Sequence, residues 1–142
     1  MLTVGTAKDA LRRAGIRVTP QRLMIIDVLV DNCTHPTAED IYLRVRQQYP
    51  SISLATVYHT LTLLSQQGLV LELHGAKEGL RCDPDTTPHA HAYCERCSGV
   101  FDIPVPSLQT WHTTALPGFH ADKAEISLYG VCGECQAVSA QP

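Results

Sequence analysis

The chain contains 142 residues, of which 44% are hydrophobic and 18% are charged, and its formal net charge is −3. These values are typical of a soluble globular protein of one or two small domains, and they exclude a disordered or low-complexity chain. Most of the arginines lie in the first half, but this excess is too small to indicate nucleic-acid binding by itself. Because six cysteines occur without an evident secretion signal or apolar membrane segment, we expect a cytoplasmic protein.

Two helices are predicted near the N-terminus. Residues 6–14 form the first, and Gly15 ends it, because glycine commonly follows the last residue of a helix. Thr19 and Pro20 then start a second helix as its N-cap and its first helical residue. The apolar residues of this helix recur at roughly helical spacing, so one of its faces belongs to a core. These residues are Leu23, Ile26, Val28, Leu29 and Val30.

Two further helices are predicted between residues 37 and 68. Thr37 starts the third helix with acidic residues in its first turn, which the helix dipole favours, and Pro50 ends it. Ser53 is the expected N-cap of the fourth helix, and Gly68 lies at its C-terminus. The residues of the third helix expected to face inward are Ile41, Val45 and Tyr49.

A β-hairpin is predicted after the fourth helix, with strands at 69–73 and 79–82 and a turn at Gly75. Short helices followed by a hairpin are the order of a winged helix-turn-helix, whose last helix enters the DNA major groove. Side chains near the start of that helix suit contacts with bases and phosphates, namely Ser53, Thr56, Tyr58 and His59. A helical core packed on a hairpin, without any DNA binding, explains the same pattern equally well.

Two Cys-x-x-Cys pairs predict a structural zinc site. Cys94 with Cys97 and Cys132 with Cys135 supply four thiolates, which is the donor set of a closed tetrahedral Zn²⁺ site. The 34 residues from 98 to 131 are too long for a simple zinc ribbon, so a small subdomain must lie between the pairs. A disulfide framework is the alternative, and it suits short secreted chains rather than this one.

A second group of possible metal ligands lies just before the first cysteine pair. His89 and His91 alternate by two, so on an extended segment both imidazoles project from one face. Asp83 precedes them and Asp102 follows. Imidazole and carboxylate donors together favour Fe²⁺, Mn²⁺ or Zn²⁺. His35, in the turn before the third helix, completes the ligand set if the two halves of the chain fold toward each other.

Two other classes of protein are compatible with parts of this pattern. An enzyme needs an open metal position, but five protein ligands leave little room for a substrate, and no general base or oxyanion donor is evident. We therefore expect neither catalysis nor a small-molecule substrate. A zinc-stapled interaction module would explain the cysteine pairs but not the histidine and aspartate residues.

The order of these motifs closely resembles the ferric uptake regulator family of metal-dependent transcriptional repressors. The resemblance extends over almost the whole chain and is specific, because many separate motifs occur in the same order and spacing. The matching segments are Val18–Arg22, His35–Tyr42, Thr56–Leu61, Asp83, His89–His91, Cys94 with Cys97, Asp102, Tyr129–Gly130 and Cys132 with Cys135.

The resemblance implies an α+β fold with a winged helix-turn-helix DNA-binding domain at 1–82 and a hinge carrying metal ligands at 83–92. Residues 93–142 would form a small α/β dimerisation domain with the four-cysteine zinc site. It also implies a homodimer that binds a double-stranded DNA operator when loaded with metal, and no membrane partner. The implied regulatory ligands are His35, Asp83, His89, His91 and Asp102, and the DNA-binding candidates are Arg22, Ser53, Thr56, Tyr58 and His59.

Within the family, the chain looks most like the peroxide-responsive repressors. Iron uptake regulators more often carry glutamate where this chain has Asp102. In the peroxide-responsive branch, bound Fe²⁺ reacts with hydrogen peroxide and oxidises a ligand histidine, and the matching positions are His35 and His89. Bound Mn²⁺ supports repression without that chemistry. The alternative is a manganese- or zinc-homeostasis regulator of the same family.

Three departures from the family pattern affect this interpretation. Cys82 occupies a position usually held by an aromatic or aliphatic residue, close to where zinc-responsive members use a cysteine ligand, although a small buried apolar role is favoured. Ala90 and Ala124 stand where iron regulators place accessory-site ligands, so no functional accessory site is expected. His59 replaces a common arginine or asparagine, so operator preference is expected to differ. The remaining histidines, His112 and His120, are predicted to be structural or solvent-facing.

Overall fold

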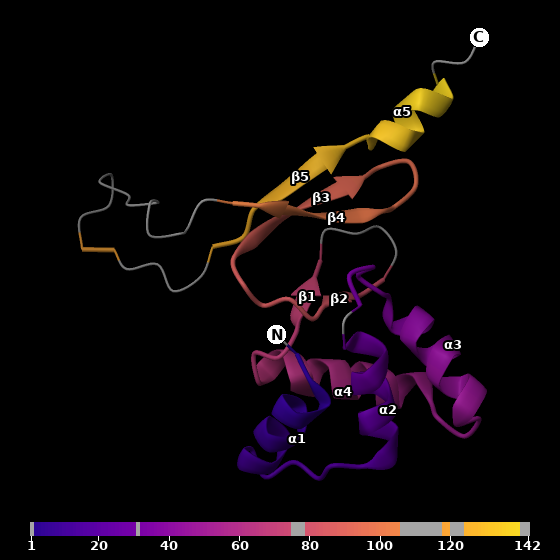
Figure 1. The fold of residues 1–142 in the computed structure, drawn as a ribbon, viewed down its shortest axis with the longest axis vertical. Helices are drawn as coiled ribbons and strands as arrows, with labels where there is room; N and C mark the ends of the chain where they lie inside the picture. Colours follow the sequence, from indigo (N-terminus) through magenta and orange to yellow (C-terminus); the bar gives the residue numbers. More distant parts are fainter. Residues whose placement is uncertain (1, 31, 75–78, 106–117, 120–123, 140–142) are drawn as a thin grey trace. The chain divides into compact units, whose positions relative to one another are not determined.

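The computed structural model describes residues 2–30, 32–74, 79–105, 118–119 and 124–139 (Figure 1). The chain divides into two compact units, Met1–Thr87 and Pro88–Pro142, which we call the N-terminal unit and the C-terminal unit. Within the described ranges, no helix is both long enough and apolar enough to cross a membrane.

The N-terminal unit contains four helices followed by an antiparallel pair of short strands (Figure 1). The predicted order of elements is therefore confirmed, and it is the order of a winged helix-turn-helix domain. The elements are α1 (Val4–Arg13), α2 (Pro20–Leu29), α3 (Ala38–Gln48), α4 (Leu54–Gln66), β1 (Leu71–Leu73) and β2 (Arg81–Asp83).

A hydroxyl side chain caps the start of each of these helices. Thr19 caps α2, Thr37 caps α3 and Ser53 caps α4, as the sequence predicts, and each accepts a hydrogen bond from a backbone N–H of the first turn. The first helix begins at Val4 rather than at residue 6, because Thr3 and Thr6 form a reciprocal capping box. The prediction of its start was wrong for that reason.

The core of the N-terminal unit is formed by the inward faces of the four helices. Ile26, Ile41 and Leu61 are completely buried in it, one from each of three helices. In α2 the buried face includes Ile25, whereas Val28 is only partly buried. The apolar stripe of that helix is therefore rotated slightly from the predicted one.

The two strands of the N-terminal unit are short. They pair with Leu71 opposite Asp83 and Leu73 opposite Arg81. The first strand begins at Leu71 and not at residue 69. The predicted turn at Gly75 lies outside the described residues.

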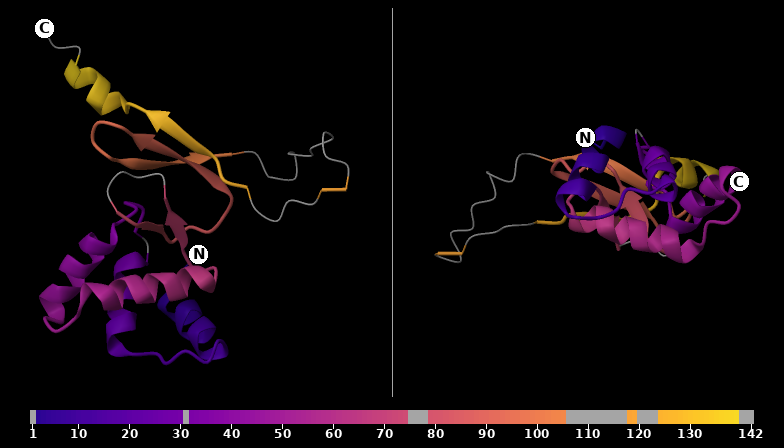
Figure 2. Two further views of the ribbon diagram at one scale, coloured as in Figure 1. Left: turned by 180° about the vertical axis from the view of Figure 1, so that it is seen from behind. Right: turned by 90° about the horizontal axis from the view of Figure 1, so that it is seen from below.

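The C-terminal unit contains a three-stranded sheet and a terminal helix. Its elements are β3 (His89–Cys94), β4 (Val100–Pro104), β5 (Ser127–Gly130) and α5 (Gly133–Ser139). The strand order is β4-β3-β5, with β4 antiparallel and β5 parallel to the central β3. These strands, orange to yellow in Figures 1 and 2, lie side by side. A mixed helix-and-sheet fold is thus confirmed for the chain.

The segment predicted as a hinge, 83–92, includes the last residue of β2 and the first four residues of β3. Between these strands, the backbone N–H of Asp85 donates to Asp83 Oδ1 at 2.8 Å, and the backbone N–H of Thr87 donates to Asp85 Oδ1 at 2.9 Å. Such side-chain-to-backbone bonds form compact turns. Asp83 and Asp85 therefore stabilise a turn in the connection between β2 and β3.

Candidate metal centres

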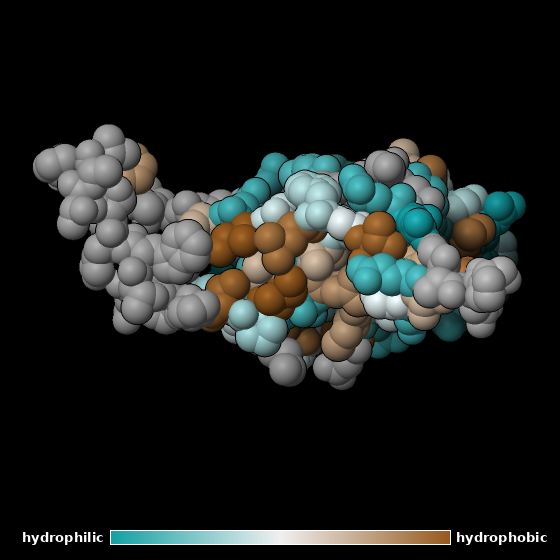
Figure 3. Space-filling view, turned by 90° about the horizontal axis from the view of Figure 1, so that it is seen from above, coloured by the Kyte–Doolittle hydropathy of each residue, from teal (hydrophilic) through white to brown (hydrophobic). Residues whose placement is uncertain are grey.

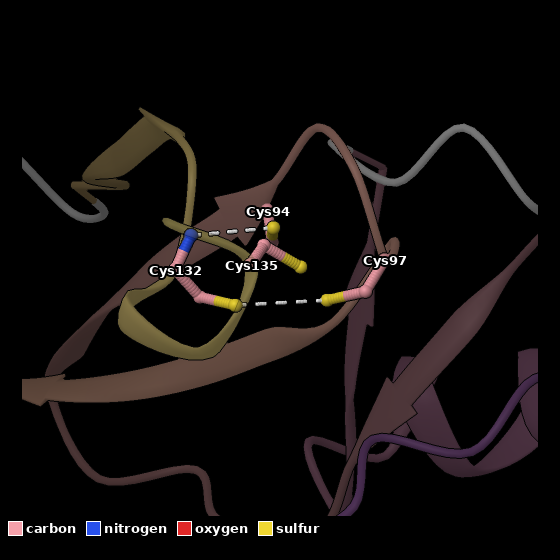
Figure 4. A group of neighbouring side chains, drawn as sticks. All are labelled: Cys94, Cys97, Cys132 and Cys135. Carbon is pink, nitrogen blue, oxygen red and sulfur yellow. Dashed lines mark hydrogen bonds between the residues drawn. The ribbon is translucent and has the colours of Figure 1, made fainter. Parts of the chain in front are cut away.

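The four cysteines of the two Cys-x-x-Cys pairs meet at one end of the sheet. Cys94 ends β3, and Cys135 lies in the first turn of α5. One sulfur from each of the four residues lies within 4.8 Å of the others, and in Figure 4 the side chains point toward a common centre. The backbone brings the pairs together because Cys94 lies opposite Gly130 in the parallel pairing of β3 with β5.

The sulfur geometry fits zinc. Cys97 Sγ and Cys132 Sγ are 3.8 Å apart (Figure 4). Zinc–sulfur bonds of about 2.3 Å in a tetrahedron place neighbouring sulfurs about 3.8 Å apart. The cluster of Cys94, Cys97, Cys132 and Cys135 therefore fits a structural zinc ion.

The four thiols can all be deprotonated together only when a cation lies between them. The backbone N–H of Cys132 donates to Cys94 Sγ at 3.3 Å, and this bond is the main reason why the pKa of the Cys94 thiol falls to about 6. The neighbouring Cys132 side chain instead raises the pKa of the Cys135 thiol to about 12. Four thiolates this close repel one another, so a divalent cation is needed to hold all of them deprotonated.

Arg96 braces the cysteine cluster, a role that the sequence did not suggest. Its Nη1 donates to the backbone carbonyl of Cys135 at 2.9 Å, which joins the first cysteine pair to the second. Glu95 N–H donates to the carbonyl of Gly130 at 2.7 Å and joins the same two segments. Such bonds behind the ligands fix the orientation of the sulfurs.

A second group of donors, His89, His91 and Asp102, lies within the C-terminal unit. The two histidines are on one face of β3, as their alternation predicts, and His91 pairs directly with Asp102 on β4. His89 Nε2 is 2.9 Å from His91 Nε2, and Asp102 Oδ1 is 3.4 Å from the first and 3.7 Å from the second. The sheet register therefore brings Asp102 to the histidines.

These three donor atoms can surround one divalent cation. A circle through them has a radius of about 2.0 Å, which is close to the bond lengths of about 2.0–2.2 Å between a divalent metal and imidazole nitrogen or carboxylate oxygen. A divalent cation here would be held by His89, His91 and Asp102, and three donors would not complete its set of ligands. Two nitrogens and one oxygen are donors that suit Fe²⁺, Mn²⁺ and Zn²⁺.

The N-terminal unit carries a separate pair of possible ligands, His35 and Asp83. His35 Nε2 lies 3.8 Å from Asp83 Oδ2. Two ligands of one cation can be at most two bond lengths apart, and a metal–ligand bond is about 2.1 Å long. One cation can therefore bind both atoms. The other oxygen, Asp83 Oδ1, accepts the hydrogen bond from the Asp85 N–H. That bond leaves Oδ2 directed at the histidine, and Asp85 is a supporting residue that no motif in the sequence indicated.

Cys82 does not belong to either group of ligands. Its side chain is completely buried in the apolar core of the N-terminal unit, on the strand face opposite that of Asp83. Burial, with smaller contributions from Glu72 and Asp83, raises the pKa of its thiol to about 12. Because apolar core residues surround this thiol, the structure favours the apolar role for Cys82.

The candidate DNA-binding residues lie on α2 and α4 of the N-terminal unit. At the start of α4, Ser53 and His59 are exposed, whereas Thr56 and Tyr58 are half-buried. Ser53 is the helix N-cap and accepts from the backbone N–H of Thr56 at 3.1 Å. Arg22 on α2 is also half-buried, and its guanidinium donates to the backbone carbonyl of Arg17. The α4 residues thus occupy the solvent side of their helix.

Two further predictions concern an accessory metal site. Ala90 is buried in β3 and Ala124 is exposed before β5. Neither side chain offers a metal donor. His112 and His120 lie outside the described residues.

The structure thus shows a helical unit of winged-helix order and a sheet unit in which four cysteines are arranged to fit a zinc ion. The chain matches the sequence model of the ferric uptake regulator family over residues 13–129. It belongs to this family, whose members are transcriptional regulators.

Individual relatives are similar over almost the full length of the chain. The peroxide operon regulator of Bacillus subtilis (strain 168) is 39% identical over 131 residues, which cover 91% of this chain and 90% of that protein. The structure of the Campylobacter jejuni peroxide stress regulator is 29% identical, with a TM-score of 0.66, and the match covers 95% of this chain and 100% of that one. The Helicobacter pylori ferric uptake regulator, at 21% identity, has a TM-score of 0.80 over 94% of each chain, which is a likeness of fold.

Proposed function

We propose that the protein is a metal-dependent, DNA-binding transcriptional repressor that senses hydrogen peroxide. The observation that carries this proposal is the His89, His91 and Asp102 group, whose three donor atoms lie on a circle of metal-binding size. Similarity to proteins named as peroxide regulators supports the choice of signal.

The regulatory metal site is proposed to contain five ligands from both units. The three donors of the C-terminal unit leave open positions, and the His35 and Asp83 pair of the N-terminal unit can supply the remaining two ligands. A cation that binds both groups favours the arrangement of the units in which all five ligands reach it, and it disfavours other arrangements. Metal binding would thereby set the positions of the two α4 helices of a dimer, which carry the proposed DNA contacts.

The regulatory cation is proposed to be Fe²⁺ or Mn²⁺, with Zn²⁺ as a further candidate. All five ligands offer nitrogen or oxygen, and no sulfur donor belongs to this group among the described residues. Such a set does not favour soft metals, and similar sets bind all three ions, so cellular availability decides between them.

Peroxide sensing would depend on the ligand histidines. Ferrous iron, when bound, would promote the cleavage of the O–O bond of hydrogen peroxide without being consumed, and the imidazole would supply the two electrons. The net change is the addition of one oxygen atom to the imidazole of His35 or His89, with release of water. An oxidised imidazole is a weaker donor, so the five-ligand arrangement is lost and repression ends.

DNA binding is proposed for the exposed side of α4. Ser53, Thr56, Tyr58 and His59 would contact the major groove, and Arg22 would contact a phosphate. The partner is a double-stranded operator with two half-sites, because a two-fold dimer presents two such helices. A cytoplasmic location follows from this partner and from the need to keep the zinc-site thiols reduced.

A homodimer is supported by the sheet of the C-terminal unit. Phe101, Ala92 and Leu128 are in register across β4, β3 and β5, on the face opposite His91. Phe101 is 46% exposed and Leu128 51% exposed, and a hollow lies between them over the small Ala92. Figure 3, seen from above, shows neighbouring apolar residues in brown on the face that it draws. Exposed apolar patches of this kind mark protein–protein interfaces.

The function is tested by operator binding under defined metal conditions. Duplexes are first selected from a random pool with the zinc-loaded, Mn²⁺-bound protein. Binding is then titrated with Mn²⁺, Fe²⁺ or Zn²⁺, with and without peroxide. We expect Mn²⁺ and Fe²⁺ to induce binding, and peroxide to release only the Fe²⁺ form, with one oxygen added to a peptide containing His35 or His89.

The other outcomes identify the alternatives. Binding in both the Mn²⁺ and Fe²⁺ forms despite peroxide indicates a metal-homeostasis regulator. An absence of metal-dependent binding to any duplex indicates an interaction module. His35→Ala with unchanged metal dependence of DNA binding would show that the metal does not join the two units.

A further inference from the structure

His35 has a left-handed backbone conformation, which is uncommon for residues other than glycine. Its φ is +48°, in the left-handed region where a side chain is disfavoured. Such a conformation costs free energy and persists only where surrounding contacts hold it. A proposed metal ligand in this conformation raises the question of what holds it.

The segment after His35 runs beside β2 of the same unit. The backbone N–H of Ala38 donates to the carbonyl of Leu80 at 3.0 Å, and the N–H of Cys82 donates to the carbonyl of Pro36 at 3.1 Å. These two bonds fix the chain from Pro36 onward. They do not reach His35 itself.

Arg81 donates a hydrogen bond to His35 itself. Its Nη1 donates to the carbonyl of His35 at 2.9 Å, and its backbone forms an antiparallel bridge with Thr37. Arg81 and Asp83 are two residues apart on β2 and therefore project from the same strand face. One strand thus supplies both the carboxylate beside the imidazole and the guanidinium that anchors the histidine backbone.

We propose that Arg81 is a positioning residue of the regulatory metal site. By holding the His35 carbonyl, it keeps the residue in its left-handed conformation and the imidazole beside Asp83. The inference rests on the proposed function, because it takes His35 as a ligand. Arg81 itself binds no metal.

Charge and positioning predict opposite effects for the loss of Arg81. A guanidinium close to a cation site repels the cation, so removal of its charge alone would strengthen metal binding. Removal of a group that orients a ligand weakens metal binding, typically 10–100-fold. The direction of the change therefore separates the two roles.

The experiment is a titration of the full-length, zinc-loaded protein with Mn²⁺ alone, in which free Mn²⁺ is measured by electron paramagnetic resonance. We expect Arg81→Met to bind Mn²⁺ about 10-fold more weakly. Arg81→Lys, which retains a donor and the charge, should recover most of the affinity. Arg13→Met makes the same chemical change at an exposed position in the last turn of α1 and should bind Mn²⁺ like the wild type.

Two controls show that β2 itself is intact. Zinc content should stay the same, and the amides of Ala38 and Cys82 should keep their protection from hydrogen exchange, because their bonds are to backbone carbonyls. If Arg81→Met does not fold, Arg81→Gln replaces it, with the same expected and contrary results.

Unchanged or tighter Mn²⁺ binding by the Arg81 variant overturns the inference. His35→Ala in the same titration tests the proposed site separately. If His35→Ala loses affinity while Arg81→Met keeps it, only the role of Arg81 is refuted. If His35→Ala binds Mn²⁺ like the wild type, the five-ligand site fails and the role of Arg81 fails with it.

Discussion

The hydroxyl of Tyr58 on α4 donates a hydrogen bond to Glu39 Oε1 on α3, at a distance of 2.8 Å. This bond, followed by slight burial and the charge of Glu39, raises the pKa of the phenol. A hydroxyl has one proton to donate, so the oxygen of Tyr58 offers only lone pairs to other groups. It can therefore accept from an adenine or cytosine amino group, but it cannot donate to a phosphate.

This relationship predicts a base-specific role for the Tyr58 hydroxyl. Tyr58→Phe should weaken operator binding by about 1 kcal/mol, the usual net value of one hydrogen bond, and leave binding to random duplexes unchanged. Fluorescence anisotropy with both kinds of DNA measures the effect. Tyr42→Phe on α3, whose hydroxyl accepts from Arg46, is the matched control. Equal losses on both kinds of DNA would assign the hydroxyl to the phosphate backbone.

Removal of zinc should unfold the C-terminal unit. Cys135→Ser leaves three thiolates, so we expect zinc content to fall to zero and the sheet signal in circular dichroism to be lost, because a structural zinc site contributes roughly 10 kcal/mol or more to folding. Cys33→Ser changes an exposed cysteine of the N-terminal unit and should keep its zinc. Full zinc content in Cys135→Ser would contradict a four-cysteine site.

The capping box of α3 should stabilise the protein in a pH-dependent way. The Thr37 N–H and hydroxyl both donate to Asp40 Oδ2, at 2.9 and 2.7 Å, and these bonds hold the pKa of Asp40 below its ordinary value of 3.8. A lowered pKa means that the stabilisation is complete above the unfolded-state value and is lost as pH falls through the folded-state value. We expect Asp40→Asn to cost about 1 kcal/mol at pH 7 and progressively less below pH 4.

Urea unfolding followed by helical circular dichroism measures this difference at each pH. Thr19→Ala removes the cap of α2, which has no acidic partner in its first turn, so its cost should not change over the same range. A constant difference for Asp40→Asn down to pH 3 would exclude the ionised carboxylate as the source of the stabilisation.

Cys82 should affect stability but not metal binding. Cys82→Ala leaves a small cavity and should cost about 1–2 kcal/mol, whereas Cys82→Ser buries a hydroxyl and should cost more. Because burial raises the pKa of this thiol to about 12, the folded protein should resist alkylation at Cys82 at neutral pH. Metal titration of Cys82→Ala checks the alternative, since a zinc-sensing cysteine ligand would be revealed by a loss of Zn²⁺ affinity.

The fold was largely predictable because its signals are local. Thr19, Thr37 and Ser53 each accept a hydrogen bond from a free N–H group of the first helical turn. That effect depends only on residues close by in the sequence. The start of α1 was missed because its capping box uses Thr6, which lies inside the helix. The rotation of the buried face of α2 depends on which helices it packs against. The spacing of apolar residues along the sequence does not reveal those neighbours.

The metal donors were predictable as residue types, and their neighbours were not. Cys-x-x-Cys spacing and the alternation of His89 with His91 are properties of the sequence alone. Asp102 joins the histidines only through the pairing of β4 with β3, and Arg81 reaches His35 across 46 residues of chain. Long-range strand pairing decides such contacts, because many registers satisfy the same local pattern.

The sequence by itself determined where α2, α3 and α4 begin, that four thiolates are available for zinc, and that two imidazoles share one strand face. Only the tertiary structure decided that Cys82 is a core residue, that the Tyr58 proton is committed to Glu39, and that three donors of the C-terminal unit lie at metal-binding distances. The reason is physical. Caps and alternation act within a few residues, whereas a core position, a hydrogen-bond partner and a donor geometry exist only after distant segments have packed together.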